Sequence, residues 1–354
     1  MQQAILAMNS IGTALLAYFF DHALGDPPNR WHPVAWQGQL LAWAESRIRK
    51  WGTKNQKTKS KGREPGFELQ CLEQGPAQPQ NAAAVDLVWF AGGAGALAVG
   101  MAASAGTLWG VERMTLQLPW LSRLLIEALL LKLALSARGL DRAAGEVEAA
   151  LRRGDLSEAR RLLGWHLVSR DTSDLSAEEV VGAAVESVAE NLTDAFVAPL
   201  CAYVAGGLPA VWAYRFCQTA DSMWGYHDPA HEWLGKSAAR LDDALNWLPA
   251  RLAAALLIAS AALCGEDARQ AWRTRRTQAN RTASPNAGQT MAAMAGALGV
   301  TLTKRGHYTL AGGDQPVTPD TLRRARRVVR TAAILGAMMA TLASLLRRRT
   351  SETH

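Results

Sequence analysis

The sequence predicts an all-α, polytopic integral membrane protein, a helical bundle that contains a re-entrant or broken helix. Although 49% of the 354 residues are hydrophobic, these residues gather in blocks close to the ~17–25 residues that a membrane-spanning helix needs. Glycines interrupt one block and ionisable residues lie in or beside others, as in a bundle with a polar interior. The blocks are residues 3–20, 82–109, 120–137, 195–217, 247–264 and 329–346.

The first block, residues 3–20, resembles a signal peptide. However, the residues before it carry no basic side chain, and no A-x-A cleavage site follows Phe20. A basic start and such a site are both typical of signal peptides that are removed. We therefore expect this block to remain as a membrane anchor.

A basic stretch follows between residues 45 and 63. It holds eight Lys or Arg residues and one Glu, a net charge of +7 that equals the excess of the whole chain. By the positive-inside rule this stretch is cytoplasmic. Residues 51–80 are rich in Lys, Gln, Gly and Pro, and we expect them to form a flexible cytoplasmic linker near anionic lipid headgroups. The stretch contains no recognisable nucleic-acid-binding module, so we expect no nucleic-acid partner.

Four ionisable residues lie in or beside the apolar blocks. Charged groups at membrane depth usually face a bundle interior or a water-filled cavity. The alternative for each is a side chain that reaches the membrane surface. These residues are Asp86, Glu127, Lys132 and Arg251.

A helix with acids on one face is predicted just before the block 195–217. Ser176 and Glu179 form a capping-box pattern, so this helix should begin near Ala177. At ~100° per residue the apolar positions fall opposite the acids. For an arbitrary helix, a solvated acidic face is the commoner explanation, and a functional site is the alternative. The apolar positions are Val181, Val185, Val188 and Leu192, and the acids are Glu186, Glu190 and Asp194.

The block 195–217 is interrupted by Gly206, Gly207 and Pro209, which predicts a broken or re-entrant helix. The polar segment 216–252 follows it. This segment has the acids and cations of a magnesium-phosphate site, and structural ion pairs are the alternative explanation. The residues concerned are Asp221, Lys236, Arg240, Asp242, Asp243 and Arg251.

Several other motifs are incomplete. His231-Glu232 lacks the second His of H-E-x-x-H. Residues 234–237 imitate the end of a P-loop, but Ala230 stands where its first glycine should be. Residues 93–98 imitate a dinucleotide fingerprint inside a membrane-like run, where small-residue helix packing is the better interpretation. The cysteines form no C-x-x-C pair, which indicates neither a zinc site nor a disulfide framework: Cys71, Cys201, Cys217 and Cys264.

The order of these motifs along the chain closely resembles the adenosylcobinamide-phosphate synthase family of cobalamin biosynthesis (CobD/CbiB). The resemblance runs from about Asp21 to Tyr308, with the linker outside it. It implies one membrane-embedded synthase-like domain over residues 1–354 in a bacterial inner membrane. The motifs are DHALGDPPNRWHPVAWQGQL, SRDTSDL, AAVESVAENLTDAFVAPL, YRFCQTADSMWGY, GKSAARLDDALNWLPARL, SPNAG and MAGALGV.

The resemblance also implies the reaction, an amide bond between adenosylcobyric acid and (R)-1-amino-2-propanol O-phosphate or a related aminoalcohol. The product would be adenosylcobinamide phosphate. A carboxylate and an ammonium do not join in water without activation, so we expect ATP as co-substrate and Mg²⁺ near the acids. The expected partners are the corrinoid, the aminoalcohol phosphate, membrane lipid, and a second copy of the chain or other corrinoid-pathway enzymes.

Site residues follow from the matching motifs. We expect Glu186, Glu190 and Asn286 to be catalytic, by handling the incoming ammonium or polarising an oxygen. Guanidinium and ammonium groups would hold phosphate: Arg170, Arg215, Lys236 and Arg240. The expected metal ligands are Asp194, Asp221 and Asp242.

The chain departs from the family pattern after SPNAG. Gln289-Thr290-Met291 replaces the common Trp-Pro-Glu, so one acid is missing, and Lys304-Arg305 adds charge further on. Two other functions therefore stay open. A transporter would use the acids at 186–194 as an ion relay, and a non-catalytic scaffold would hold other corrinoid enzymes at the membrane.

Overall fold

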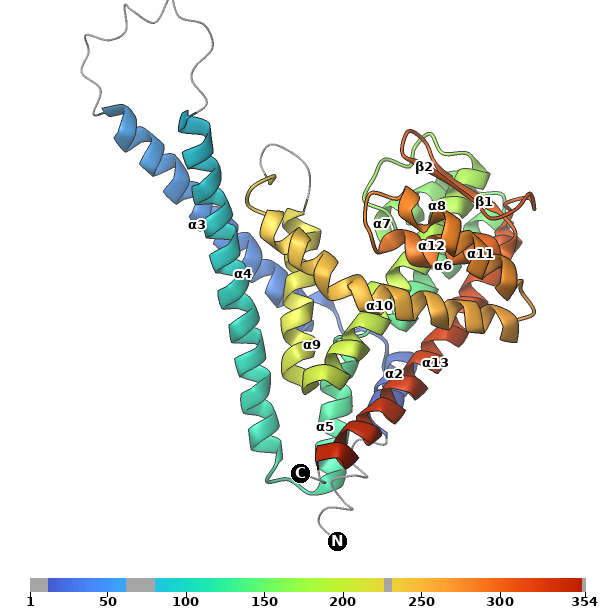
Figure 1. The fold of residues 1–354 in the computed structure, drawn as a ribbon, viewed down its shortest axis with the longest axis horizontal. Coiled ribbons are helices and arrows are strands. Elements are labelled where there is room, and N and C mark those ends of the chain that lie inside the picture. Colours follow the sequence, from blue (N-terminus) through green and yellow to red (C-terminus); the bar gives the residue numbers. More distant parts are fainter. Residues whose placement is uncertain (1–11, 62–79, 226–230, 352–354) are drawn as a thin grey trace, which may run out of the picture. The chain divides into compact units, whose positions relative to one another are not determined.

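The computed structural model describes residues 12–61, 80–225 and 231–351. The described chain is almost entirely helical (Figure 1), which confirms the all-α prediction. The long and medium helices are α2 (Thr13–Leu24), α3 (Pro33–Lys61), α4 (Gln80–Thr115), α5 (Trp120–Lys132), α6 (Ala137–Arg152), α7 (Leu156–His166), α8 (Ala177–Leu192), α9 (Ala198–Trp224), α10 (Lys236–Leu263), α11 (Ala268–Gln278), α12 (Ala287–Leu298) and α13 (Pro319–Ser351). Shorter elements are η1 (Asn29–Trp31), the π-helix η2 (Thr193–Val197), η3 (Ala279–Arg281), and the strands β1 (Thr301–Lys304) and β2 (Tyr308–Ala311).

The chain divides into two compact units. Unit 1 comprises Met1–Pro27, Ala105–Trp212 and Asp243–His354, and unit 2 comprises Pro28–Ser104 and Ala213–Asp242. The expected single domain over residues 1–354 stays a prediction. Helix α3 continues to Lys61, so the first part of the expected linker 51–80 is helical, while residues 62–79 lie outside the described residues.

Four helices in the described chain are long and apolar enough to cross a membrane, which makes this a membrane protein. They confirm the predicted blocks 82–109, 195–217, 247–264 and 329–346. The matching helical segments are Leu87–Thr115, Ala177–Trp224, Lys236–Leu263 and Pro319–Leu346.

The block 120–137 was wrongly predicted to span. Helix α5 has only 13 residues and ends at Lys132, whereas a span needs ~17–25. Lys132 is buried and its Nζ lies 2.8 Å from Asp26 Oδ1. The ion pair fixes this end of α5 inside unit 1, and the next helix starts at Ala137. The block 3–20 falls partly outside the described residues, and its described part belongs to the 12-residue α2.

The predicted break in the block 195–217 is confirmed. Gly206 and Gly207 leave the helical conformation inside α9, and Gly207 has a φ of +68°, which favours glycine. Where the helix restarts after the break, the Leu208 N–H has no acceptor within the helix. It donates instead to Glu112 Oε1 over 3.0 Å. The re-entrant path through a membrane stays a prediction.

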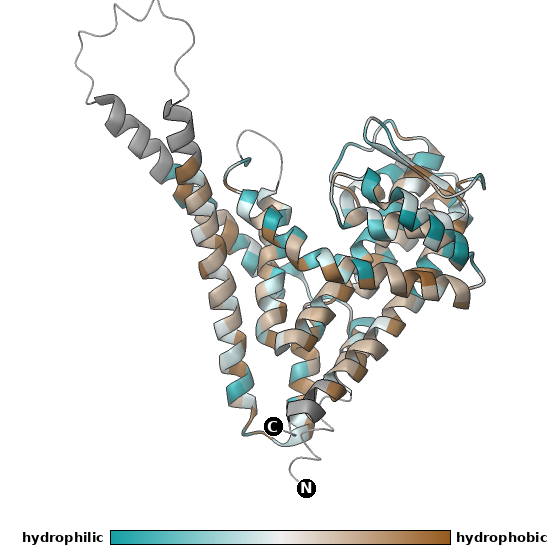
Figure 2. Cartoon of the chain, in the orientation of Figure 1, coloured by the Kyte–Doolittle hydropathy of each residue, from teal (hydrophilic) through white to brown (hydrophobic). Residues whose placement is uncertain are grey.

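Unit 1 is built around α8. This helix packs against α6, α7, α12, α13 and β1 (Figure 1). Every residue from Val180 to Ala189 is buried, as expected for a helix surrounded on all sides. Figure 2 shows many hydrophilic residues in the helices around α11, and more hydrophobic residues along much of the C-terminal half of α13.

A β-hairpin covers one side of α8 and was not foreseen from the sequence. Strands β1 and β2 pair in antiparallel register, with Lys304 opposite Tyr308. Gly306 in the turn has a φ of +73°, so it adopts a left-handed conformation that other residues rarely take. The hairpin therefore presents Lys304 and Tyr308 as cross-strand neighbours.

Unit 2 has its own core. Large buried residues from α3, α4, α9 and α10 meet there, including Leu41, Leu97, Phe216 and Trp224. The Trp224 indole N–H donates to Glu45 Oε2 over 3.2 Å. Helix α4 is continuous through residues 93–98, so the sequence resembling a dinucleotide fingerprint lies in mid-helix.

Candidate functional site

The acids predicted on α8 are buried inside unit 1. The helix begins at Ala177 with the predicted capping box, in which Ser176 and Glu179 satisfy each other's backbone N–H groups. Glu186 is only 6% exposed and Glu190 is half-buried. The solvated-face interpretation is therefore wrong for Glu186. Burying a carboxylate is costly unless it is paired, so its surroundings decide what it can do.

Tyr308, Arg170 and Lys304 surround these acids. The Tyr308 hydroxyl hydrogen-bonds to Glu186, and both Arg170 and Lys304 interact with Glu186 electrostatically. Lys304 also interacts with Glu190. Within the described residues neither acid forms an ion pair, and Glu186 Oε1 is buried with no hydrogen-bond partner. We call these five residues the acid cluster.

The hydroxyl of Tyr308 is suited to remain a donor. Burial, and then the negative charges of Glu186 and Glu190, raise the pKa of Tyr308 above its usual value. The hydroxyl therefore stays protonated at neutral pH and can donate a hydrogen bond to a carboxylate. An acid held in this way can accept a proton or a hydrogen bond from a third group.

The departure at residues 289–291 touches this cluster. The Tyr308 hydroxyl lies 3.8 Å from Met291 Sδ, and Met291 is the position where the resemblance described above implies a Glu. A carboxylate at residue 291 would stand beside Tyr308 and close to Glu186. The missing acid would therefore have belonged to the acid cluster, and the chain has a neutral side chain there instead.

Asn286 lies in a second polar region of unit 1, directly before α12. Its Nδ2 donates to the Asp243 carbonyl over 2.8 Å, and its Oδ1 accepts from Arg251 Nη1 over 3.3 Å. The residue is 7% exposed. Gly288 allows this arrangement, because a Cβ there would lie 2.0 Å from the Ala279 carbonyl oxygen. Asn286 is thus fixed in place, and Tyr308 and Met291 lie on or against the same helix.

The remaining predicted residues, except Asp194, lie in unit 2 on two helices that pack together. Arg215 and Asp221 are on α9, and the Arg215 guanidinium hydrogen-bonds to Gln218. Lys236 pairs with Glu232 over 3.4 Å and lies over the Trp233 ring. Arg240 is exposed and Asp242 is partly buried on α10. The structure thus brings together Glu186, Glu190 and Arg170 in unit 1, and Arg215, Lys236, Arg240, Asp221 and Asp242 in unit 2.

A compact metal cage does not form among the described residues, where no three His, Cys, Asp or Glu side chains converge. Asp221 and Asp242 both interact electrostatically with the buried thiol of Cys217. Asp194 lies in unit 1 within η2, a π-helical turn. Such turns are rare and are often found at functional sites. The three metal assignments stay predictions.

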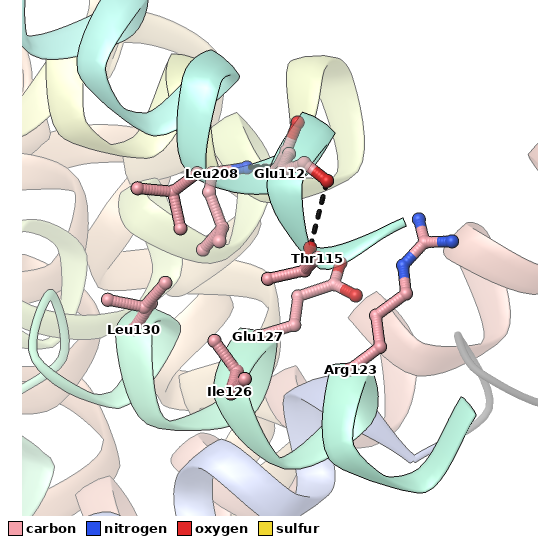
Figure 3. Close-up of a pocket in the computed structure, with 8 residues that line it drawn as sticks. Glu112, Thr115, Arg123, Ile126, Glu127, Leu130 and Leu208 are labelled. Atoms are coloured by element: carbon pink, nitrogen blue, oxygen red, sulfur yellow. Dashed lines mark hydrogen bonds between the residues drawn. The ribbon is translucent and has the colours of Figure 1, made fainter. Parts of the chain in front are cut away.

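A pocket in unit 1 contains none of the predicted site residues. It has about 260 Å³ of empty space beside the break in α9. Its acids serve the fold, because Glu112 caps Leu208 and Glu127 accepts from the Tyr203 hydroxyl over 2.6 Å. Its lining residues are shown in Figure 3: Val111, Glu112, Thr115, Arg123, Ile126, Glu127, Leu130 and Leu208.

Three of the ionisable residues beside the apolar blocks have partners inside unit 1. Lys132 and Glu127 bond there, and Arg251 reaches Asn286, which favours the interior alternative for these three residues. The side chain of Asp86 lies outside the described residues. Tyr308 was missed as a site residue, and the only sequence signal near it was the charge at Lys304.

Comparison with known proteins shows which family this chain resembles. The family described as "CobD/Cbib protein" matches residues 14–338. The chain is 37% identical to "Cobalamin biosynthesis protein CobD" of Dehalococcoides mccartyi over 314 residues, covering 87% of this chain and 89% of that protein. It is 36% identical to the protein of the same name from Chromobacterium violaceum over 347 residues, covering 96% and 98%.

A third relative carries the other family name. "Cobalamin biosynthesis protein CbiB" of Salmonella arizonae is 33% identical over 309 residues, covering 87% of this chain and 86% of that protein. No solved structure matches this chain. The family match covers most of the chain, and these relatives are matched over most of their length. The chain therefore belongs to the CobD/CbiB family and is an enzyme of cobalamin biosynthesis.

Proposed function

We propose that this protein is an ATP-dependent acid–amine ligase. It joins the free carboxylate of adenosylcobyric acid to the amino group of (R)-1-amino-2-propanol O-phosphate, or a related aminoalcohol, and releases adenosylcobinamide phosphate. The observation that supports this best is the acid cluster, in which two acids have no ion-pair partner among the residues the structure describes, while a tyrosine and two cations surround them. The amine reacts in its neutral form, so a substrate that arrives as an ammonium must first give a proton to an acceptor such as a carboxylate.

In this proposal Glu190, which is half-buried, takes the proton from the ammonium, and Glu186 orients the amine. Tyr308 holds Glu186 by a hydrogen bond, so the carboxylate keeps one direction. The positive charges of Arg170 beside Glu186, and of Lys304 beside both acids, partly offset the cost of burying these carboxylates. Asn286, fixed by Asp243 and Arg251, polarises an oxygen of the reacting carboxyl group.

ATP activates the corrinoid carboxylate, and Mg²⁺ would neutralise phosphate charge when bound. Mg²⁺ usually keeps several waters and binds through one or two carboxylates together with substrate phosphates. The pair Asp221 and Asp242, both near Cys217, fits such an incomplete set. Lys236, Arg240 and Arg215 would contact the phosphates from the same two helices. Asp194 remains a third candidate ligand.

The proposal is tested by incubating detergent-purified protein with adenosylcobyric acid, aminopropanol phosphate, ATP and Mg²⁺. Mass analysis of the corrinoid should show the addition of the amine with loss of one water, only when ATP is present. A matched reaction with the Glu190→Gln protein should give little product. Unchanged corrinoid with the natural protein would contradict ligase activity, and corrinoid flux into vesicles without product would favour the transporter.

We also propose that the protein lies in a bacterial inner membrane with the basic stretch 45–63 in the cytoplasm. The test is a single cysteine at Lys57 in a cysteine-free protein. A membrane-impermeant thiol reagent should label it in inverted vesicles and not in intact spheroplasts. Labelling only in spheroplasts would show that the basic stretch lies on the outer side of the membrane.

A further inference from the structure

Two arginines of unit 1 lie close together, and the described part of the chain offers neither of them a carboxylate partner. Arg251 on α10 and Arg275 on α11 interact electrostatically as like charges. Among the described residues neither forms an ion pair. Arg251 donates only from Nη1, to the Trp247 carbonyl over 2.6 Å and to Asn286 Oδ1 over 3.3 Å. Arg275 donates only from Nε, to Gln289 Oε1 over 3.0 Å.

Both guanidinium groups are held in place by neutral neighbours. Asn286 and Gln289, which are 7% and 6% exposed, accept from them. The Trp247 ring lies 4.2 Å from the Arg251 guanidinium carbon, and the Trp272 ring lies 5.4 Å from that of Arg275. An arginine carries five N–H donors, so most donors of this pair remain available after these contacts. Two fixed cations with unused donors form a site for an anion.

Two other partly buried arginines of unit 1 are paired with carboxylates. Arg324 is paired with Glu266, and Arg326 lies between Asp141 and Glu148. Burial lowers the pKa of Arg275 from its usual value, in agreement with a cation that has no balancing charge. The lack of a balancing carboxylate within the described part of the chain thus distinguishes Arg251 and Arg275 from Arg324 and Arg326.

We infer that Arg251 and Arg275, supported by Asn286 and Gln289, bind the phosphate of the phosphorylated aminoalcohol. A phosphate monoester carries a charge of about −1.5 to −2 at pH 7 and three strong acceptor oxygens. Two planar guanidinium groups match the charge and the shape of a phosphate monoester. A single carboxylate would neutralise only one of the two guanidinium groups. The identity of the ligand rests on the proposed function, but binding of phosphate does not.

The pair lies at the start of α12. Asn286 and Gln289, which accept from Arg251 and Arg275, are three residues apart and share one side of this helix. Met291, which touches Tyr308 of the acid cluster, points to nearly the opposite side of α12 from Gln289. Phosphate binding by the pair would select amines that carry a phosphate.

The test compares Arg251→Gln and Arg275→Gln with Arg276→Gln, a neighbouring exposed arginine that serves as control. Each variant is assayed with aminopropanol phosphate and with unphosphorylated aminopropanol. The two site variants should raise the KM for the phosphorylated amine by about 10- to 100-fold, as for loss of hydrogen bonds to a charged group. For Arg275→Gln, which does not touch Asn286, kcat/KM for the unphosphorylated amine and the KM for ATP should not change. Arg275→Lys, which keeps the charge and loses the fork, should show a smaller rise.

A binding measurement separates this inference from the proposed function. Calorimetric titration with inorganic phosphate should show binding to the natural protein and to Arg276→Gln, and none to the two site variants. That result would support the phosphate site even if no ligase activity were found. An equal loss for both amines in Arg275→Gln, a defect confined to ATP, or phosphate binding unaffected by Arg251→Gln would overturn it. If the two site variants bound inorganic phosphate normally and lost only their binding to phosphatidylglycerol vesicles, the pair would be a lipid site, and this would also overturn it.

Discussion

Two groups of buried charges in unit 1 differ in how completely they are paired. Between α6 and α13, Asp141 accepts from Arg326 and Arg330, and Arg326 also pairs with Glu148 over 2.6 Å. On α8, Glu186 and Glu190 have cations nearby but no ion pair among the described residues. The first group binds two helices together. The second leaves Glu186 Oε1 without a hydrogen-bond partner in the described part of the chain.

The degree of ion pairing separates two kinds of buried charge in this protein. A fully paired network is expected to matter for stability, because removal of one member leaves a buried charge unbalanced. An incompletely paired acid already has an unfavourable position, and proteins keep such positions mainly at functional sites. Each group should therefore respond to mutation in a different assay.

The largest effect on stability is expected from Arg326→Met. The substitution leaves Glu148 buried without its inter-helix partner and weakens the hold on Asp141, so the free energy of unfolding should fall by about 3 kcal/mol. Unfolding in a denaturing detergent would measure it. Arg323→Met, which removes an exposed ion pair, is the control and should cost less than about 1 kcal/mol. Equal losses in both variants would contradict a structural role for the network.

Glu190→Gln, in the acid cluster, should lower activity and leave stability nearly unchanged. The side chain keeps its size and loses its charge, so ligase activity should fall at least ~10²-fold, the low end for a positioned acid or base. Its unfolding midpoint should stay near that of the natural protein. Glu158→Gln, at an exposed ion pair with Arg161, is the matched control. Near-normal turnover of Glu190→Gln would remove this acid from the mechanism.

A smaller change is expected for Tyr308→Phe. Loss of the hydroxyl removes the hydrogen bond that orients Glu186, and kcat/KM should drop about tenfold, the low end for a hydrogen bond to a charged group. The ring remains, so folding should be unaffected. If Tyr308→Phe reduced stability and left kcat/KM unchanged, the hydroxyl would belong with the structural charges.

The smallest and most gradual effect should come from pH. Burial alone would raise the pKa of Asp141, but hydrogen bonds and charge from Arg330 and Arg326 outweigh it and hold that pKa below its usual value. A lowered native pKa means that the network stabilises fully above the unfolded pKa of ~3.9 and loses this stabilisation as pH falls through the native pKa. Thermal unfolding from pH 6 downward should show the loss only below about pH 4. Asp141→Asn should flatten that part of the curve, and an unchanged curve would assign the loss to other acids.

Much of the helical framework could be predicted because its signals are local. The capping box at Ser176 and Glu179 and the break at Gly206 and Gly207 each depend on a few neighbouring residues. The prediction that block 120–137 spans the membrane was wrong because hydropathy does not show that Lys132 pairs with Asp26, from a distant part of the chain. The β-hairpin was missed because its strands are short and polar on one side.

The candidate site was predicted only in part for the same reason. The motifs indicated that Glu186, Glu190 and Asn286 matter, but not what surrounds them. Tyr308 and Lys304 reach α8 because the hairpin folds back over it. Arg275 gains significance only through its closeness to Arg251 and its bond to Gln289.

The amino-acid sequence by itself determined the helical class, most of the apolar spans and the family, because periodicity, end caps and ordered motifs are properties of the chain read in one direction. Only the tertiary structure decided which charges are balanced. Pairing depends on distances between side chains from separate helices, and burial by surrounding helices sets the cost of leaving a charge unpaired. The distinction between the Asp141 network and the acids of α8 therefore exists only in the folded protein.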